Sequence, residues 1–308
     1  MEVFMTARKA LENCVLYVRK AKKLKLPTAL TSQILHCVTF TIERPKTQFE
    51  SAMVIFSVDV DVGNKALGLI NQGKNDSHVH KFYRECRVGE IEEQALPLFV
   101  DVFNEFKVPV TFAIRGQLTE IDDHFLPFLL SSPVKHDIGA HGYSHRKFSD
   151  LSQNEAETEL NLLSVGMKKF GIIPRSFVFP RNIVSHLDLL ERFGYECYRE
   201  AGDFLNDGMY IERRGRLYDI HPSLYLSQDS RVVFLKKILN IAVEKRTPLH
   251  LWFHPWSFGE TNTQIKRKIK DLLIPFLDYA KTKEETQALK FETMLSAARK
   301  ANNMLKNT

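Results

Sequence analysis

Hydrophobic residues gather into short, nearly unbroken runs along the chain, and segments with a helical spacing of apolar residues lie between them. The short runs have the composition of buried parallel strands, because both faces of such strands are covered. They fall at residues 53–58, 109–114, 137–139, 176–179 and 249–253. The segments of helical spacing fall at residues 91–106, 122–130, 152–170 and 187–193. This alternation predicts an α/β fold with a parallel sheet or barrel.

One of these helices has a clear start signal. Ser152 is followed three residues later by Glu155, which is the pattern of a capping box. The sequence therefore predicts that this helix begins directly after Ser152.

The first fifty residues differ from the rest of the chain. Residues 3–26 have apolar side chains at helical spacing, with basic residues concentrated at 19–25, so we expect an N-terminal amphipathic helix. Its basic end either matches its own dipole in a docked helix or makes peripheral contact with a membrane surface. A polar linker follows. We expect an N-terminal extension over residues 1–50 and one large domain over residues 51–308.

Composition narrows the range of partners and locations. The 308 residues carry a formal charge of +6, from 43 basic and 37 acidic side chains, which is too mild and dispersed to indicate nucleic acid binding. The 4 cysteines are scattered and form no CxxC pair, which favours a reducing compartment. No secretory signal is evident, and no uncharged apolar run approaches ~20 residues, so we expect a cytoplasmic protein that does not span a membrane.

Two acidic residues end the first predicted strand. Asp59 and Asp61 are spaced i, i+2, so their side chains lie on the same face of the strand. Carboxylates are costly to bury unless they serve a site. A turn before Gly63 is the simpler explanation if the pair is considered alone.

Two histidines follow the third predicted strand. His141 and His145 are spaced i, i+4, and on a helical turn this spacing presents two imidazoles to one metal ion. The spacing alone is weak evidence, because many such pairs lie on the surface without binding metal. A metal site therefore needs a third ligand from another strand.

Polar residues also follow two further predicted strands. Pro180, Arg181 and Asn182 follow the fourth, and His254 and Trp256 follow the last. The loops at the carboxyl ends of parallel strands converge around one crevice, so these four clusters together predict one active site. Considered alone, His254 is as consistent with a core or loop histidine as with a catalytic one. The simpler explanation of Trp256 is a packing residue instead of a substrate contact.

The strand-end residues resemble the motifs of the polysaccharide deacetylase superfamily, also called carbohydrate esterase family four or the nodulation-factor deacetylase homology domain. Asp59 and Asp61 are similar to its Asp-x-Asp motif. His141 and His145 match both histidines of its His-(Ser/Thr)-x-x-His motif, with Gly142 in place of the hydroxyl residue. The resemblance implies a distorted (β/α) barrel of about seven parallel strands.

Later segments extend the resemblance over most of the chain. Residues 251–256, which include His254, resemble the last catalytic motif in its His-Pro-Trp variant, and residues 291–294 resemble the start of the closing helix. The third motif departs from the family pattern, because Arg181 follows the proline instead of preceding it. By resemblance, Arg181 would pair with the catalytic base. Arg199 would form a surface ion pair or reach an anionic group on the substrate.

The resemblance implies a deacetylase-like catalytic domain over residues 51–308 that hydrolyses an amide with a divalent metal, most simply zinc. Asp59 would take a proton from the attacking water, Arg181 would orient Asp59, and His254 would give a proton to the departing nitrogen. The implied metal ligands are Asp61, His141 and His145. The residues expected to contact the substrate are Tyr143, Pro180, Asn182 and Trp256.

Three functions are consistent with these features. The first is removal of an N-acetyl or other acyl group from an amino sugar in a glycan or in its nucleotide- or lipid-linked precursor. The second keeps the metal but acts on a non-sugar amide, such as a cyclic imide or ureide. The third is a carbohydrate-binding protein whose altered third motif has removed catalysis.

Overall fold

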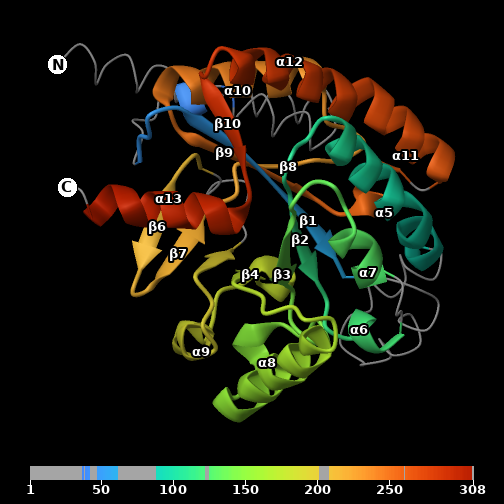
Figure 1. Ribbon diagram of the computed structural model, residues 1–308, viewed down its shortest axis with the longest axis vertical. Helices are drawn as coiled ribbons and strands as arrows, with labels where there is room; N and C mark the ends of the chain where they lie inside the picture. Colours follow the sequence, from blue (N-terminus) through green and yellow to red (C-terminus); the bar gives the residue numbers. More distant parts are fainter. Residues whose placement is uncertain are drawn as a thin grey trace, which may run out of the picture.

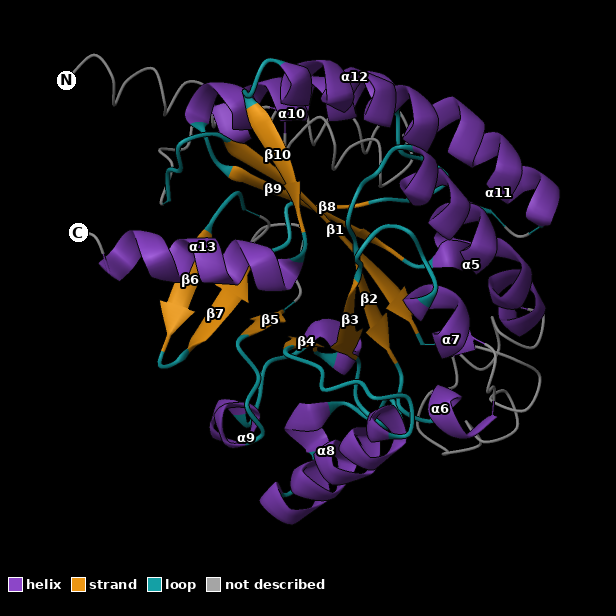
Figure 2. Cartoon of the chain, viewed as in Figure 1, coloured by secondary structure: helices purple, strands orange, loops and turns teal. Residues whose placement is uncertain are grey.

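The computed structural model describes residues 37, 39–41, 47–61, 88–121, 125–200, 208–259 and 261–306. The predicted helix over residues 3–26 and most of the extension over residues 1–50 lie outside these ranges. Within them, the helices and strands build a mixed α/β fold whose mostly parallel sheet curls into half a barrel (Figures 1 and 2). This confirms the predicted fold class.

The sheet has 10 strands in the part of the chain that is described, in the order β6-β7-β5-β4-β3-β2-β1-β9-β8, with β10 also paired to β1. The strands are β1 Ala52–Val60, β2 Thr111–Ile114, β3 Asp137–Ala140, β4 Ser176–Val178, β5 Cys197–Arg199, β6 Ile211–Arg214, β7 Leu217–Ile220, β8 Leu224–Tyr225, β9 Pro248–Phe253 and β10 Leu289–Glu292. Only the β6–β7 pair is antiparallel among these strands.

The helices cover both faces of the sheet. They are α5 Val88–Glu105, α6 Leu118–Ile121, α7 Phe125–Leu130, α8 Gln153–Lys168, α9 Leu187–Arg192, α10 Val232–Lys245, α11 Asn262–Lys268, α12 Ile274–Glu285 and α13 Met294–Lys306. A π-helical turn, Ile269–Leu273, joins α11 to α12, and short 3-10 turns follow β4 and β9 at Pro180–Asn182 and Pro255–Phe258. No helix within the described ranges is long and apolar enough to cross a membrane.

Strand β1 is the centre of the sheet. Residues 53–58 pair with β9 on one edge, while the other edge is shared end to end by β10 and β2. All 9 residues of β1 are buried, which is the reason for its nearly continuous apolar sequence. The expected buried parallel strand is therefore confirmed, and Asp59 and Asp61 lie at its carboxyl end.

Alternate residues of β1 face two separate cores. Phe56 packs against Phe103 of α5 and Phe276 of α12, with ring centroids 5.1 and 6.2 Å apart. Met53 and Ile55 point to the opposite face, where they pack with the small residues of α13. Asp59 shares the spacing of Met53 and Ile55, so it lies on the α13 face of the curled sheet.

The sequence located most of the first elements and missed several later ones. The capping box forms as expected: Ser152 accepts from the backbone N–H of Glu155, and the Glu155 side chain accepts from the N–H of Ser152. Of the helix expected at 122–130, residues 125–130 form α7 as expected, and residues 122–124 lie outside the described ranges. The short helix α6, just before them, had no expectation. The β6–β7 hairpin, β8, β10 and helices α10 to α12 had no expectation, although Leu235, Ile238, Leu239 and Ala242 of α10 are buried at helical spacing.

Candidate active site and metal centre

The four polar clusters converge where β1, β3, β4 and β9 end. Asp61 follows β1 and His141 follows β3, while the 3-10 turn at Pro180 follows β4 and His254 follows β9. The parallel register of β1 with β2 and of β2 with β3 brings these ends to one edge of the sheet. The expectation that parallel strands would gather these residues is met.

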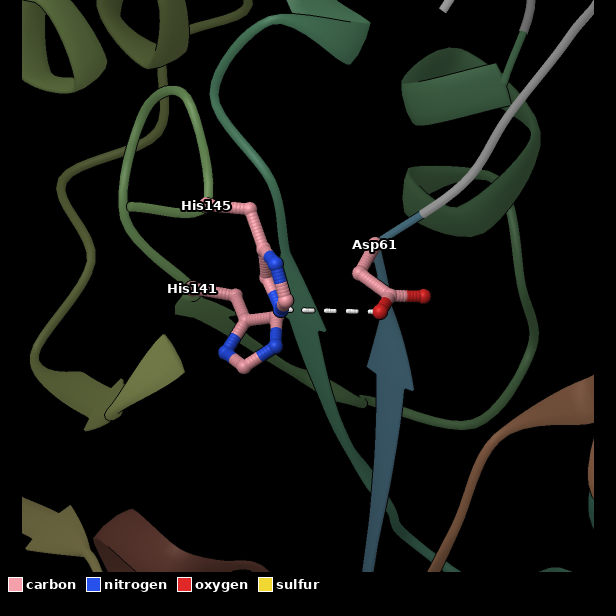
Figure 3. A group of neighbouring side chains, drawn as sticks. All are labelled: Asp61, His141 and His145. Carbon is pink, nitrogen blue, oxygen red and sulfur yellow. Dashed lines mark ion pairs between the residues drawn. The ribbon is translucent and has the colours of Figure 1, made fainter. Parts of the chain in front are cut away.

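Three side chains form a group that could bind a metal ion (Figure 3). One ligand atom from each of Asp61, His141 and His145 lies within 4.8 Å of the others. Nε2 of His145 is 3.5 Å from Oδ2 of Asp61, and the two imidazole centroids are 4.8 Å apart. The expectation of a helical turn is wrong, because residues 141–145 form an irregular loop, and His145 has a left-handed φ of 62°.

His141 is held in the tautomer that leaves its Nε2 able to bind a metal ion. Its Nδ1–H donates to the carbonyl oxygen of Val178 at 2.8 Å, which leaves the Nε2 lone pair for a ligand. Nε2 is buried and has no hydrogen-bond partner among the residues that are described. An unpaired buried nitrogen is costly in a core, but it is the normal state of a metal ligand before binding.

The electrostatics of the group also suit a divalent cation. Burial lowers the pKa of both imidazoles, and the pKa of His145 falls to about 3, so both rings are neutral near pH 7. Burial would raise the pKa of Asp61, but the three nearby histidines outweigh it and lower the pKa below its usual value. A carboxylate and two neutral imidazoles fit zinc or a similar first-row metal.

Two residues absent from the sequence expectations support the metal-binding loop. Glu159 of α8 is buried, and its carboxylate accepts from the backbone N–H groups of Tyr143 and Ser144 at 3.1 and 2.8 Å. Arg115, after β2, donates to the carbonyl oxygens of Asp61 and Ser144 at 3.2 and 2.8 Å. Arg115 therefore joins the end of β1 to the histidine loop. Its position at a strand end was a signal that could have identified it.

Gly142 explains the departure from the family's second motif. Its φ is +66°, and a Cβ at this position would lie only 2.9 Å from Cγ of Pro180. Both features exclude a serine or threonine without movement of the loop. Pro180 thus packs on the histidine loop, which is a contact different from the substrate contact that we predicted for it.

The arginine that holds Asp59 is Arg199, and the expected role of Arg181 is corrected. Arg199 Nη1 and Nη2 donate to Oδ1 and Oδ2 of Asp59 at 2.8 and 2.5 Å, a bidentate pair in which both side chains are buried. Asn182 accepts from Nη2 of the same guanidinium at 3.1 Å, so it belongs to this clamp. Arg181 lies instead within electrostatic range of Asp61.

Arg199 was misread because its strand, β5, is only 3 residues long. The short run before it resembled a surface segment, and an exposed ion pair is the default for an arginine there. The parallel pairing of β5 with β4 and β7 places Arg199 at the same edge as the other strand-end residues. The rule that located His141 and His254 would have located Arg199 had the strand been recognised.

A buried chain of hydrogen bonds supports the clamp. Arg199 Nη1 also donates to Oγ of Ser57 at 2.8 Å, and Ser57 lies 2.8 Å from Nε2 of His250. Nδ1 of His250 lies 2.9 Å from the carbonyl oxygen of Ile220 and donates to it, so Nε2 accepts from Ser57. The Trp252 ring covers the guanidinium at 4.3 Å. Both η nitrogens of Arg199 are bonded and the guanidinium is covered by Trp252, and these contacts fix its plane.

The clamp keeps Asp59 ionised. Burial would raise the pKa of this carboxyl, but the charge and hydrogen bonds of Arg199, with the nearby histidines, lower the pKa to about 2. Asp59 is therefore a carboxylate at any physiological pH. It lies beside the metal group without being part of the three-ligand set.

His254 lies close to both carboxylates. Its Nε2 is 3.8 Å from Oδ2 of Asp59 and 3.7 Å from Oδ2 of Asp61. The Trp256 ring stacks on it with centroids 4.4 Å apart and an interplanar angle of 28°. The ring of Trp256 thus orients His254, and its role as a sugar wall stays a prediction.

Tyr143 is placed at the side of the site. Its hydroxyl hydrogen-bonds the Glu120 carboxylate, and burial followed by this contact raises the pKa of Tyr143 to about 12. Its ring lies against the backbone at Gly116. Substrate contact by Tyr143 also stays a prediction.

This chain is similar to one known protein family and to several solved structures. Residues 88–196 match the family model described as polysaccharide deacetylase. A comparison of the sequence with curated proteins finds no match. Three solved structures are similar over most of their length. The first is a protein of Mycobacterium smegmatis assigned to the polysaccharide deacetylases, with 16% identity, a TM-score of 0.60, and coverage of 85% of this chain and 94% of that one. The second is the Puue allantoinase, with 14% identity, a TM-score of 0.61, and coverage of 84% of this chain and 93% of that one. The third is a protein of Pseudomonas aeruginosa PAO1 assigned to the polysaccharide deacetylases, with 14% identity, a TM-score of 0.59, and coverage of 81% of this chain and 90% of that one.

This chain is thus similar to the polysaccharide deacetylases in fold and, over residues 88–196, in sequence. The resemblance to the polysaccharide deacetylase superfamily, predicted from the strand-end motifs, is confirmed.

Proposed function

We propose that this protein uses a divalent metal, zinc by preference, to remove an N-acetyl or other acyl group from an amino sugar. The substrate is a glycan or its nucleotide- or lipid-linked precursor. The observation that carries the proposal is the placement of Asp59. This ionised carboxylate is held by Arg199, lies outside the metal-ligand set and faces His254 across 3.8 Å.

The arrangement suits amide hydrolysis. A metal held by Asp61, His141 and His145 would supply Lewis-acid polarisation of the amide carbonyl and of the attacking water. Asp59 accepts the proton of that water, because its carboxylate is ionised and fixed in direction by Arg199. His254 donates a proton to the departing nitrogen, which is a poor leaving group as an anion.

A non-sugar amide is the second candidate substrate. The observation that favours it is the similarity of the fold to the Puue allantoinase, which is as close as the similarity to the two deacetylase-like structures. The same residues would act on a cyclic imide or ureide. The products differ, because opening a ring releases no acetate.

The carbohydrate-binding alternative has less support than either enzyme. It arose from the displaced arginine of the third motif, and Arg199 supplies the missing ion pair to Asp59 from β5. Binding of a glycan without turnover by the fully metallated protein would favour that alternative.

The test is a product assay on the zinc-loaded protein. The substrates are nucleotide-linked, lipid-linked and polymeric N-acetylamino sugars, with cyclic imides and ureides as the second group. We expect acetate release from the sugars. Ring opening without acetate release would replace the first proposal with the second, and turnover of neither group would contradict both.

Variants connect the activity to the site. We expect Asp59→Asn to retain zinc and to lose turnover by about 10²- to 10⁴-fold, the usual contribution of a general base. His141→Ala should lose both the zinc of the active site and turnover. Asp150→Asn, on an exposed residue paired with Lys147, is the matched control and should keep both. Near-normal acetate release by Asp59→Asn would rule out Asp59 as the base.

We also propose a cytoplasmic location with peripheral membrane contact through residues 3–26, which would suit a lipid-linked substrate. Support comes from the basic residues at 19–25. Cosedimentation with anionic vesicles, lost when these basic side chains are neutralised, is the expected result. Equal sedimentation of both forms would contradict a role for this charge.

A further inference from the structure

A second group of carboxylate and imidazole side chains lies where β5 and β7 end. One ligand atom from each of Glu200, Asp219 and His221 lies within 4.8 Å of the others. We propose that this group binds a second divalent first-row cation, such as Zn²⁺, separate from the metal of the active site.

The second group is on the opposite face of the sheet from the Asp59 clamp. Glu200 directly follows Arg199, so the two side chains leave the chain on opposite sides. Strands β5 and β7 are parallel with Tyr198 opposite Asp219, which places these two side chains on one face. His221, two residues after Asp219, continues on that face.

Asp219 is the strongest indication of a missing partner. It is 0% exposed, and neither of its carboxylate oxygens has a hydrogen-bond partner among the described residues. His221 Nδ1 and Arg214 Nη2 are each 3.7 Å from Oδ2, which is beyond hydrogen-bond distance. The carboxylate therefore has two basic neighbours nearby but no direct hydrogen bond to either of them.

The phenol of Tyr198 is a second, independent indication. Tyr198 is 0% exposed, and its hydroxyl has no hydrogen-bond partner within the described part of the chain. Tyr198 lies opposite Asp219 in the pairing of β5 with β7, so its side chain is on the same face as the second group. A cation with its bound water would give this hydroxyl a partner and would neutralise the carboxylate beside it.

His221 is already oriented for binding. Its ring stacks on Tyr210 with centroids 4.2 Å apart and an interplanar angle of 16°. Nδ1 points to Glu200, with 3.3 Å between Nδ1 and Oε1. An imidazole nitrogen and two carboxylates form a donor set typical of zinc and manganese.

Arg214 is the competing source of positive charge. Its Nη2 is 3.9 Å from Glu200 and 3.7 Å from Asp219, but its side chain is 42% exposed. An exposed guanidinium at these distances contributes little compared with a cation bound directly by three ligands. The bound ion would tie the ends of β5 and β7 together and immobilise Glu200 next to the clamp residue Arg199.

The experiment measures zinc content of the full chain. The protein is stripped with a chelator, reloaded with Zn²⁺ and freed of unbound metal by gel filtration. We expect two zinc ions per chain in the natural protein, and one after Asp219→Asn or after the double change His141→Ala and His145→Ala. Glu212→Gln, on the 52% exposed neighbour in the same hairpin, is the control and should retain two.

A thermal measurement provides a second readout that is independent of activity. In the background lacking His141 and His145, added Zn²⁺ should raise the Tm, and Asp219→Asn should abolish that rise. His221→Gln repeats the test if Asp219→Asn fails to fold, as judged by circular dichroism. One zinc ion per chain in the natural protein, or a zinc content that neither Asp219→Asn nor His221→Gln lowers, would overturn the proposal.

Discussion

The metal-binding side and the base-binding side of the active site are held in place by different kinds of contact. On the metal side, a short loop is fixed through its backbone, whose N–H groups donate to the buried carboxylate of Glu159. On the base side, Asp59 is fixed through its side chain by the bidentate ion pair with Arg199. One side is a shaped loop, and the other is a buried charge pair.

The two sides also differ in how far apart in the sequence their bonded residues lie. The metal loop and Glu159 are close in sequence, because the bonded partners are only 16 and 15 positions apart. Arg199 and Asp59 are 140 residues apart, and His250 and Ser57 are 193 residues apart. Substitutions on the metal side should therefore act locally on metal affinity, whereas substitutions on the base side should act on the whole fold.

The largest expected effect is that of Arg199→Met. Removing one partner of a buried ion pair leaves Asp59 as an uncompensated buried charge, which costs about 3–5 kcal/mol of unfolding free energy. The pKa of Asp59 should rise from about 2, because burial raises it once Arg199 is gone, so the acid limb of kcat/KM should move to higher pH. Urea unfolding and a pH–rate profile measure the two effects.

Arg181→Met is the control for this change. Arg181 is outside the bidentate pair with Asp59, so we expect a smaller loss of unfolding free energy and an unmoved acid limb. Equal effects of the two substitutions would contradict the assignment of the clamp to Arg199.

The next effect in size is that of Glu159→Gln. The amide keeps one acceptor and loses the charge that holds two backbone N–H groups and the Ser144 hydroxyl, so the loop loosens. Zinc affinity should fall by about 10- to 100-fold, as is usual for residues that orient metal ligands. Isothermal titration measures it. Glu157→Gln, on the same helix and paired with Arg192 at the surface, should leave the affinity unchanged.

The unfolding free energy should depend on pH through His250, which lies on the base-binding side. Burial, followed by the charge of Arg199, lowers the pKa of His250 to about 3, while its unfolded value is about 6.5. Between these values the unfolded chain binds a proton that the folded chain does not. The unfolding free energy should therefore fall as pH drops from 6.5 toward 3, by at most about 1.4 kcal/mol per pH unit for this group.

Urea unfolding between pH 7 and 4.5 measures this dependence. His250→Asn should reduce the slope by the contribution of one proton, although it also lowers stability at every pH. A slope unaffected by His250→Asn would show that this ring does not stay neutral in the folded protein.

The smallest effect separates the stability of helix α8 from the shape of the metal loop. Ser152→Ala removes the N-cap of the helix that carries Glu159 and should cost about 1 kcal/mol of unfolding free energy. Zinc affinity should stay the same, because Glu159 lies two turns further along the helix. A loss of affinity as large as that of Glu159→Gln would mean that the helix start, and not the carboxylate, supports the loop.

The sequence by itself determined the central strand, the α/β class and five of the residues at the strand ends. A strand buried on both faces must be apolar throughout, so Asp59 and Asp61 stood out at the end of β1. Likewise, His141, His145 and His254 each follow a recognisable apolar run. These features are local, and local patterns of hydrophobicity report them directly.

The tertiary structure alone decided which arginine holds Asp59 and what supports the histidine loop. Arg181 follows the short strand β4 and Arg199 ends the short strand β5, and only the pairing of β5 with β4 and β7 brings Arg199 to Asp59. In the sequence, Glu159 is an ordinary acidic residue of a helix. Only the packing of α8 against the histidine loop brings its carboxylate to the N–H of Ser144. Ion pairs between distant strands depend on register and helix packing, which no single segment of sequence encodes.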